Sequence, residues 1–400
     1  MDNPTTELIT IEKLVYGGAG LARTPDRVTM VPYVLPGEQV RIAPGKVHAG
    51  FREARMAELV TPSPDRLEAP CPHFGTCGGC HYQHMSYPAQ LQAKRDILRE
   101  QLQRIGKITV EGEIGILSGE PYGYRNRIQL HLDRARLGYR EGGSHKLVPI
   151  KACPIASPKL NEAVAAIRER IHHPRFPKFI REIELFSNEQ EVQFNVVHSE
   201  EGVSKHFFDW MSEVLPGADQ PALEYRVGKD RFVVSYQSFF QVNRFLINDL
   251  VKLVLAGAEG KYALDLYAGV GLFSLPLSRL LPRVTAVEVV RGAARDLEQN
   301  ARGAPIDVVQ MPTEEYLAKL KQTPDFVLAD PPRAGLGKPA VADLVRLKPA
   351  HITLVSCDPA TLARDLAGLI AGGYGIQEVT MVDLFPQTFH LESVVRLQLR

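Results

Sequence analysis

The sequence predicts an α/β protein. Its C-terminal part is a doubly wound parallel sheet, preceded by a small β-barrel and a central region of mixed α+β structure. From residue 236 onward, buried apolar runs alternate with amphipathic segments, as in parallel strands joined by right-handed helical crossovers. Before residue 62, short β-like segments are separated by Gly and Pro turns. A chain of 400 residues suffices for two or three domains, and we expect boundaries at 1–62, 63–235 and 236–400.

The composition is that of an ordinary folded protein. No apolar run approaches the roughly 20 residues of a membrane span, and no secretory signal is visible. We therefore expect a cytoplasmic protein with no membrane association, and nothing in the sequence indicates an obligate protein partner. Residues 91–160 carry 13 Lys and Arg against 7 Asp and Glu. This local excess fits a phosphate-binding face or an ordinary solvated surface.

The N-terminal segment indicates a small all-β domain. Its turn signals are the Gly-rich stretch 16–20 and the Pro-Gly pairs at 36–37 and 44–45. The pattern is that of a small barrel of the oligonucleotide-binding type. The expected strands cover residues 8–14, 28–34, 39–43 and 55–60.

Four of the five cysteines lie in the first 153 residues. Cys71, Cys77 and Cys80 have the spacing C-x5-C-x2-C in a loop rich in Gly and Pro, and Cys153 precedes a proline. Such a loop can wrap an inorganic core, because its backbone N–H groups can bond cluster sulfurs. Structural zinc normally shows two paired arms, but three nearby histidines keep zinc open. Disulfides are not expected in a cytosolic enzyme.

The central region contains a predicted amphipathic helix and a segment rich in Arg and Tyr. The helix covers 88–106 and is a candidate to pack on the catalytic domain. Arg and Tyr side chains together can hold phosphates and stack on unpaired bases, although a strand with a charged outer face gives the same pattern. The candidate RNA-binding residues are Arg125, Arg127, Tyr139 and Arg140.

The C-terminal series of strands carries a nucleoside-type cofactor motif. Gly269 and Gly271 form a turn after the first strand, and Glu288 lies about 20 residues on, where an acid can bind ribose hydroxyls. An acid before the glycines, Asp265, favours S-adenosylmethionine (SAM), although a dinucleotide stays open. The expected strands cover 262–266, 283–287, 306–310, 326–329, 352–355, 378–382 and 394–399.

Cys357 is the candidate nucleophile. It follows the apolar run 352–355, where a strand should end, and Pro359 can open the next helix. Ligands gather at the carboxyl ends of such strands, and a nearby helix N-terminus stabilises a thiolate. The alternative interpretation is that Cys357 is a small buried apolar residue without a catalytic role. The stretch Asp330-Pro-Pro-Arg follows a neighbouring strand, but its Arg333 replaces the aromatic residue expected of an amino methyltransferase.

Together these motifs resemble the SAM-dependent RNA uracil-C5 (5-methyluridine) methyltransferases, in the subgroup with a TRAM domain and an iron–sulfur cluster. The resemblance covers nearly the whole chain. It rests on Gly-Gly-Ala-Gly-Leu-Ala-Arg, on the three-cysteine loop, and on the motifs that begin at Ser238, Asp265, Asp330, Ser356 and Phe385. Two positions depart from the family pattern, Leu272 and Phe389, and neither touches the proposed chemistry.

The resemblance implies a class I SAM methyltransferase (Rossmann-like) domain, an N-terminal OB-like TRAM barrel, and a central α+β RNA-binding domain that carries a 4Fe–4S cluster. It implies Cys357 as nucleophile, Glu392 as general base and 23S rRNA, rather than tRNA, as substrate. The residues implied for SAM are Gln241, Tyr267, Glu288 and Asp330, beside the glycines Gly269 and Gly271. The implied cluster ligands are Cys71, Cys77, Cys80 and Cys153.

The chemistry of uracil C5 methylation needs such parts. C5 is a poor nucleophile until a thiolate adds to C6, and a base must then remove the C5 proton. Two alternatives stay open from the sequence. One is an RNA-binding iron–sulfur protein with an idle catalytic domain, and the other is an amino methyltransferase that would not depend on Cys357.

Overall fold

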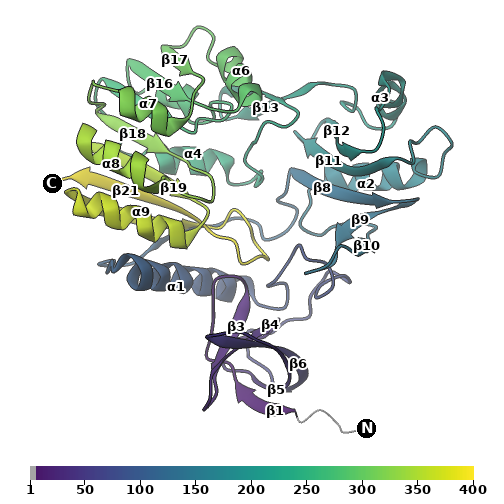
Figure 1. Cartoon of the computed structure of the whole chain (residues 1–400). Coiled ribbons are helices and arrows are strands. Elements are labelled where there is room, and N and C mark those ends of the chain that lie inside the picture. The colour runs from purple at the N-terminus through teal and green to yellow at the C-terminus, as the bar shows by residue number, and fades with distance from the viewer. Residues whose placement is uncertain (1–5) are drawn as a thin grey trace.

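The computed structural model describes residues 6–400, which form a barrel, a central antiparallel sheet and a large mixed sheet arranged around helix α1 (Figure 1). The barrel is a six-stranded sheet of order β1-β5-β6-β4-β3-β2. Its apolar residues alternate along each strand, so that Val40 and Ile42 share the buried face. Its strands are β1 (Glu7–Thr10), β2 (Lys13–Leu14), β3 (Ala19–Arg23), β4 (Val28–Pro32), β5 (Gln39–Val47) and β6 (Phe51–Thr61).

The central part is a five-stranded antiparallel sheet of order β10-β9-β8-β11-β12, followed by the hairpin β13-β14. Helix α2 begins at Pro158 because Ser157 caps it, accepting a hydrogen bond from the backbone N–H of Leu160. The elements are β8 (Arg127–Asp133), β9 (Arg136–Arg140), β10 (Leu147–Pro149), α2 (Pro158–Arg170), β11 (Ile180–Ser187), β12 (Val192–Ser199), α3 (Lys205–Ser212), β13 (Ala222–Val227) and β14 (Asp230–Ser235).

The C-terminal part is an eight-stranded sheet of order β17-β16-β15-β18-β19-β21-β20-β7, with β21 antiparallel to its neighbours. This confirms the predicted doubly wound sheet. β15 and β18 are parallel, and the order in which successive strands join the sheet reverses between them. Its strands are β15 (Tyr262–Leu266), β16 (Arg283–Val287), β17 (Ile306–Val309), β18 (Phe326–Ala329), β19 (His351–Ser356), β20 (Tyr374–Val382) and β21 (Glu392–Leu399). Its helices are α4 (Ile247–Leu255), α5 (Ser274–Leu277), α6 (Arg291–Asn300), α7 (Thr313–Lys319), α8 (Gly337–Leu347) and α9 (Pro359–Ala371).

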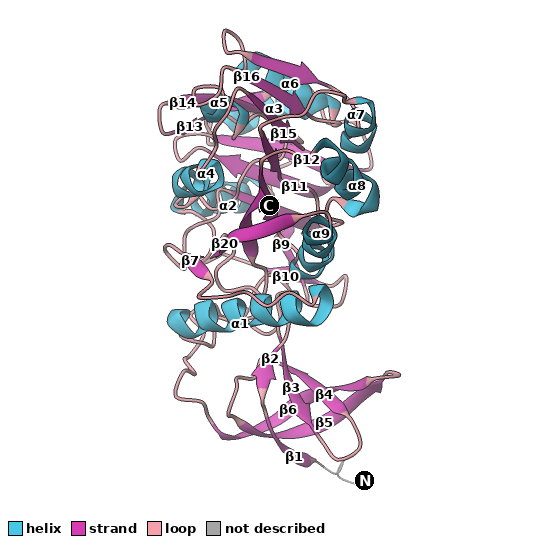
Figure 2. Ribbon diagram, turned by 90° about the vertical axis from the view of Figure 1, so that its left-hand side faces the viewer, coloured by secondary structure: helices cyan, strands magenta, loops and turns pink. Residues whose placement is uncertain are grey.

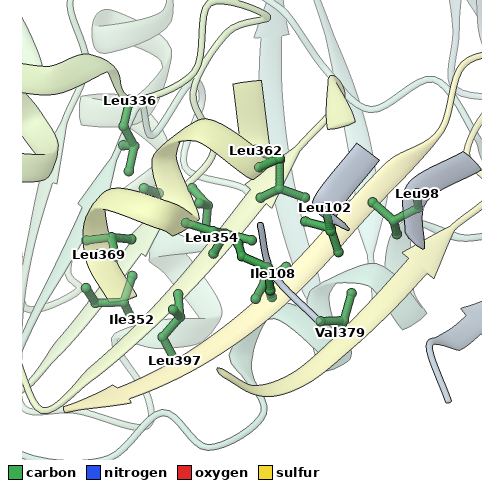
Figure 3. Close-up of a cluster of buried hydrophobic side chains, with 14 of the residues drawn as sticks. Leu98, Leu102, Ile108, Leu336, Ile352, Leu354, Leu362, Leu369, Val379 and Leu397 are labelled. Carbon is green, nitrogen blue, oxygen red and sulfur yellow. The ribbon is translucent and has the colours of Figure 1, made fainter. Parts of the chain in front are cut away.

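Helix α1 (Tyr87–Gly106) and strand β7 (Gly115–Leu117) lie with the C-terminal sheet, although the division at residues 63–235 places them in the central region. β7 is the edge strand beside β20, and α1 packs on α9. Figure 3 shows Leu98 and Leu102 of α1 pointing into the apolar cluster of α9 and the sheet. The chain therefore runs from the barrel into the catalytic sheet before it builds the central sheet.

The barrel is docked against α1 and the C-terminal sheet. Two views show α1 lying between the barrel and the rest of the molecule (Figures 1 and 2). Leu14 and Leu35 of the barrel are buried in the same apolar cluster as Leu98. Lys13 Nζ lies 2.6 Å from Glu100 Oε2 on α1. No helix in the described part of the chain is both long and apolar enough to cross a bilayer.

Candidate active site

The carboxyl ends of β19 and β18 and the start of β21 meet at one sheet edge. The register pairs Ser356 of β19 with Ser393 of β21, so Cys357 and Glu392 face each other at the next position of the two strands. Asp330 directly follows β18, the other neighbour of β19. The sheet thus places a thiol between two carboxyl groups. This is the chemistry that a covalent pyrimidine mechanism needs.

The surroundings raise the pKa of the Cys357 thiol to about 11. Burial is the largest cause, and the negative charges of Glu392 and Asp330 act in the same direction, against a smaller opposite effect of Arg333. The sequence led us to expect a thiolate stabilised by the helix that follows. The raised pKa differs from that expectation, because burial and the two carboxyl groups outweigh the stabilising contacts of the thiolate. Asp358 caps α9, and its carboxylate accepts hydrogen bonds from the backbone N–H groups of Ala360 and Thr361.

The two carboxyl groups are also perturbed. Burial raises the pKa of Asp330 to about 7. The pKa of Glu392 is raised well above its usual value by burial first and by Asp330 second. Glu392 is 5% exposed, and its Oε1 has no hydrogen-bond partner among the described residues. A buried carboxylate with a raised pKa and a free oxygen is suited to accept a proton from a substrate bound against it.

A small cavity of about 40 Å³ lies at the switch point between β15 and β18. Four residues implied for SAM line it, namely Gln241, Tyr267, Gly269 and Asp330. Cofactors of open α/β sheets bind at such a switch point. The structure therefore places these four predicted residues together.

Glu288 and the glycine turn form the neighbouring part of this site. The Glu288 carboxylate accepts hydrogen bonds from the backbone N–H groups of Gly269 (2.8 Å) and Val290 (2.7 Å). Gly269 has φ +56° and faces open space, whereas a Cβ on Gly271 would lie 2.5 Å from Leu297 of α6. Gly271 is thus required for helix packing, and Gly269 leaves room for a ligand beside the turn.

The loop 383–391 leads from β20 to Glu392 and is held by distant segments. The carbonyl of Gln387, whose φ is +68°, accepts hydrogen bonds from the backbone N–H groups of His81 (2.8 Å) and Tyr82 (3.0 Å). Gln90 of α1 accepts from the Gln387 N–H at 3.0 Å and donates to its side-chain oxygen at 3.0 Å. The cysteine loop and α1 therefore fix the approach of the chain to the candidate base.

A buried ion pair anchors the same loop to α1. Lys94 Nζ donates to Asp383 Oδ1 at 2.6 Å and to the Phe385 carbonyl at 3.0 Å, and neither charged side chain is exposed. Sequence reasoning missed this pair, since Lys94 sits among charged residues of an amphipathic helix. Its spacing from Ile97 and Leu98 placed it on the buried face and was the only available signal.

The four N-terminal cysteines line one cavity of about 230 Å³ in the central part. Burial raises the pKa of Cys71 and Cys77, and that of Cys80 to about 12. In residues 6–400, however, no group of three or more His, Cys, Asp or Glu side chains is arranged to hold a single metal ion. The arrangement offers four sulfur ligands around a volume and lacks the close geometry of a one-ion site.

The residues predicted to bind RNA have different surroundings. Arg125 and Tyr139 line the four-cysteine cavity. Arg127 donates to the Ser238 carbonyl at 2.8 Å and lies over the Phe186 ring. Arg140 is exposed and donates to the carbonyl of its own loop at His145. Of the four, only Arg140 presents its side chain at the surface.

Tyr16 reaches this site from the barrel, which the sequence did not indicate. Its hydroxyl lies 3.4 Å from the Cys357 carbonyl oxygen, and its ring meets Phe389 edge-on at a centroid distance of 5.6 Å. The only sequence signal was the Gly-rich turn after it, which we interpreted as a strand connection. A contact between residues 341 positions apart depends on domain docking.

Comparisons with known proteins agree with this geometry. The family described as tRNA (Uracil-5-)-methyltransferase matches residues 183–400. An RNA methyltransferase of Aquifex aeolicus is 33% identical, covering 98% of this chain and 98% of that protein. The 23S rRNA (uracil(1939)-C(5))-methyltransferase RlmD of Halomonas elongata is 32% identical, covering 98% of this chain and 89% of that protein.

A solved structure resembles the whole chain. It is the Pyrococcus abyssi tRNA (uracil-54, C5)-methyltransferase in complex with S-adenosyl-L-homocysteine, with a TM-score of 0.75 and 25% identity over 98% of this chain and 100% of that one. The fold and the cavity at the switch point thus define a SAM-dependent methyltransferase. The chain belongs to the RNA (uracil-C5)-methyltransferase family, and its reaction is the SAM-dependent methylation of uracil C5 in RNA.

Proposed function

We propose that Cys357 is the nucleophile and Glu392 the general base of this methyl transfer. The observation that supports this most directly is the register of β19 and β21, which sets the two side chains at facing positions beside Asp330. The site residues Gln241, Tyr267, Gly269, Gly271, Glu288 and Asp330 are proposed to hold SAM, which supplies an electrophilic methyl group.

The steps balance with these two residues. The Cys357 sulfur attacks C6, which forms the S–C6 bond and turns the C5–C6 π electrons into an enolate with carbanion character at C5. C5 would then take the methyl group of SAM, as the sulfonium S–CH3 bond breaks and neutral S-adenosyl-L-homocysteine leaves. Glu392 accepts the C5 proton, the C5–C6 double bond returns, and the S–C6 bond breaks to release the thiolate.

The thiol must lose its proton before attack. In the free enzyme its pKa is about 11, mainly because of burial and the nearby carboxylates. A sulfonium cation bound beside Asp330 offsets the negative charge there and favours the thiolate. We therefore propose that cofactor binding activates Cys357, so that the thiol stays protonated and unreactive until SAM is bound.

The proposed substrate is 23S rRNA. Relatives that cover nearly the whole chain, from Halomonas elongata and Edwardsiella ictaluri, are 23S rRNA uracil-C5 methyltransferases. The second candidate is tRNA, which is favoured by the Pyrococcus abyssi enzyme and by the family description. In either RNA the target base must be unpaired or flipped out to reach Cys357.

Unmodified 23S rRNA and tRNA are each incubated with labelled SAM and with wild-type, Cys357→Ala or Glu392→Gln protein. With wild type we expect label in free 23S rRNA and none in tRNA. We expect no label with Cys357→Ala, and with Glu392→Gln only label in RNA that stays bound to the protein. Label in tRNA alone would contradict 23S rRNA as the substrate, without affecting the proposed roles of Cys357 and Glu392. Normal transfer by Cys357→Ala would overturn the nucleophile.

We further propose that Cys71, Cys77, Cys80 and Cys153 hold a 4Fe–4S cluster. Two observations support this proposal. The four thiols line one cavity of about 230 Å³. Arg125 lines the same cavity and supplies positive charge to an anionic occupant. Uracil methylation is redox-neutral, so the proposed role of the cluster is structural.

Iron, sulfide and zinc analysis of anaerobically purified protein tests this proposal. We expect about four iron and four sulfide per chain in wild type, and loss of both in Cys80→Ala. The Cys357→Ala protein is the matched control, since it removes a thiol outside the cavity and should keep its iron. Stoichiometric zinc without sulfide would overturn the cluster.

A further inference from the structure

The barrel reaches into the catalytic centre through the turn that joins β2 to β3. The Gly18 N–H donates to the Val15 carbonyl at 3.1 Å, and Gly17 and Gly18 have φ of +105° and +91°. Other L residues rarely adopt such a backbone. A Cβ on Gly18 would also lie 3.3 Å from His81 of the cysteine loop. The turn therefore depends on both glycines, and it presents Tyr16 to the C-terminal sheet.

Tyr16 contacts the nucleophile segment directly. Its hydroxyl is 3.4 Å from the carbonyl oxygen of Cys357, a long hydrogen bond that substrate binding can shorten. The neighbouring contacts hold the turn in place, since Lys13 pairs with Glu100 at 2.6 Å and Leu14 is buried in the core of the catalytic sheet. Tyr16 is thus fixed at this position by the docking of the whole barrel.

Half-buried aromatic rings gather around Phe389, and the Tyr16 ring is one of them. The Phe389 ring lies 5.6 Å from Tyr16, 4.6 Å from His81 and 4.1 Å from His390, measured between ring centroids. They come from the barrel, the cysteine loop and the loop before Glu392. Aromatic faces of this kind stack on unpaired bases with little regard to sequence. One of these rings, that of Tyr16, belongs to the side chain that contacts the Cys357 backbone, and Cys357 must reach C6 of a base outside its stack.

Tyr16 also lines a groove on the barrel. The groove has a volume of about 940 Å³, and its charged lining residues are Lys46, Arg55 and Glu53, so that it carries a net positive charge that suits a phosphate backbone. Tyr16 is the residue that this groove shares with the surroundings of Cys357. A strand lying in the groove would therefore arrive at the nucleophile past the Tyr16 ring.

We propose that Tyr16 belongs to the target-nucleotide site, where its ring contacts the flipped uracil or the adjacent base and its hydroxyl positions the Cys357 carbonyl. This inference rests on the proposed role of Cys357. It makes the barrel a contributor to the active site, in addition to any binding of RNA elsewhere on its surface.

Tyr16→Leu and Tyr16→Phe test the two parts of the proposal. Leu keeps most of the volume and removes the aromatic face, and Phe keeps the face and removes the hydroxyl. Methyl transfer to unmodified total RNA is measured, so that the result does not depend on which RNA is the target. We expect kcat/KM for RNA to fall about 5- to 150-fold in Tyr16→Leu and about 2- to 10-fold in Tyr16→Phe.

The dissociation constant for SAM should be unchanged in both variants, since Tyr16 does not line the cofactor cavity. Leu8→Ala is the control for a change on the barrel, because Leu8 is 49% exposed and lies outside the groove. Folding is checked by the thermal midpoint of each variant. If Tyr16→Leu destabilises the barrel, the Tyr16→Phe enzyme and its pH–rate profile still report on the hydroxyl.

The outcomes separate this inference from the proposed chemistry. Wild-type kcat/KM in a folded Tyr16→Leu enzyme would overturn the role of Tyr16 and leave Cys357 in place. Full methyl transfer by Cys357→Ala would overturn the chemistry, whereas the ratio of Tyr16→Leu to wild type would still decide whether Tyr16 serves the RNA. A weaker SAM affinity in Tyr16→Leu would indicate a general structural effect and contradict the proposal.

Discussion

The four-cysteine cavity and the Cys357 site hold the same side chain beside different neighbours, although burial raises the thiol pKa in both. At the sheet edge, one thiol faces Glu392 and Asp330, which raise its pKa together with burial. In the cavity, several thiols lie close enough to raise one another's pKa, and Arg125 supplies a positive charge. A carboxylate beside a thiol suits proton transfer, whereas clustered thiols beside a guanidinium suit an anionic occupant. Neighbouring charges therefore distinguish the two roles.

Cys357→Ala should have the largest effect on methyl transfer. Without the thiol, C5 has no route to carbanion character, and we expect the rate to fall at least about a thousandfold, below detection. The iron content and the thermal midpoint should stay near those of wild type. Methyl transfer from labelled SAM and iron analysis, made on the same preparation, check the loss of activity and the unchanged iron content. Loss of iron in Cys357→Ala would contradict the assignment of Cys357 and the four cavity cysteines to two separate sites.

Glu392→Gln should slow turnover by about a hundred- to ten-thousandfold while leaving the first bond-forming steps possible. The amide cannot accept the C5 proton, so the methylated covalent RNA adduct should accumulate. Denaturing gels with labelled RNA would show a slow-migrating band in this variant. Rapid turnover without a band would mean that another group removes the proton.

Lys94→Met should lower stability more than any loss of an exposed ion pair. It leaves the Asp383 carboxylate buried without its cation, which costs about 3–5 kcal/mol of unfolding free energy. Lys13→Met is the matched control, since its partner Glu100 is partly exposed and the pair contributes about 0–1 kcal/mol. Urea unfolding of the two variants measures the difference. Equal losses would contradict the proposed anchoring of loop 383–391.

The pH dependence of Cys357 alkylation is the subtlest expected effect. Because the pKa of the thiol is about 11, little thiolate is present near neutral pH and modification by iodoacetamide should rise steadily with pH beyond 9. Saturating SAM should move this curve to lower pH. Mass mapping of the Cys357 peptide, with Cys357→Ala as blank, follows the reaction. Fast alkylation at pH 7 without SAM would contradict the raised pKa.

Local sequence predicted the parts of this enzyme that lie at strand ends. Cys357, Glu288 and the Gly269 turn each follow a recognisable strand, and the sheet topology then brings them to one edge. Contacts that depend on docking were not predictable. Tyr16 and Lys94 contact residues about 300 positions away in the sequence. The sequence around Arg125 did not indicate whether this side chain faces solvent or the cysteine cavity. The raised pKa of the Cys357 thiol was not predictable, because its causes are burial and the carboxyl groups of Asp330 and Glu392, which the folded sheet brings beside it.

RNA that carries 5-fluorouridine tests the central claim most directly. Fluorine at C5 leaves Glu392 no proton to accept, so the ring cannot be restored and the bond between Cys357 and C6 should persist. With SAM present, we predict a stable protein–RNA adduct whose crosslinked peptide contains Cys357, and none in Cys357→Ala. Methylation of ordinary RNA by a wild-type enzyme that forms no such adduct, or an adduct at another residue, would contradict the account.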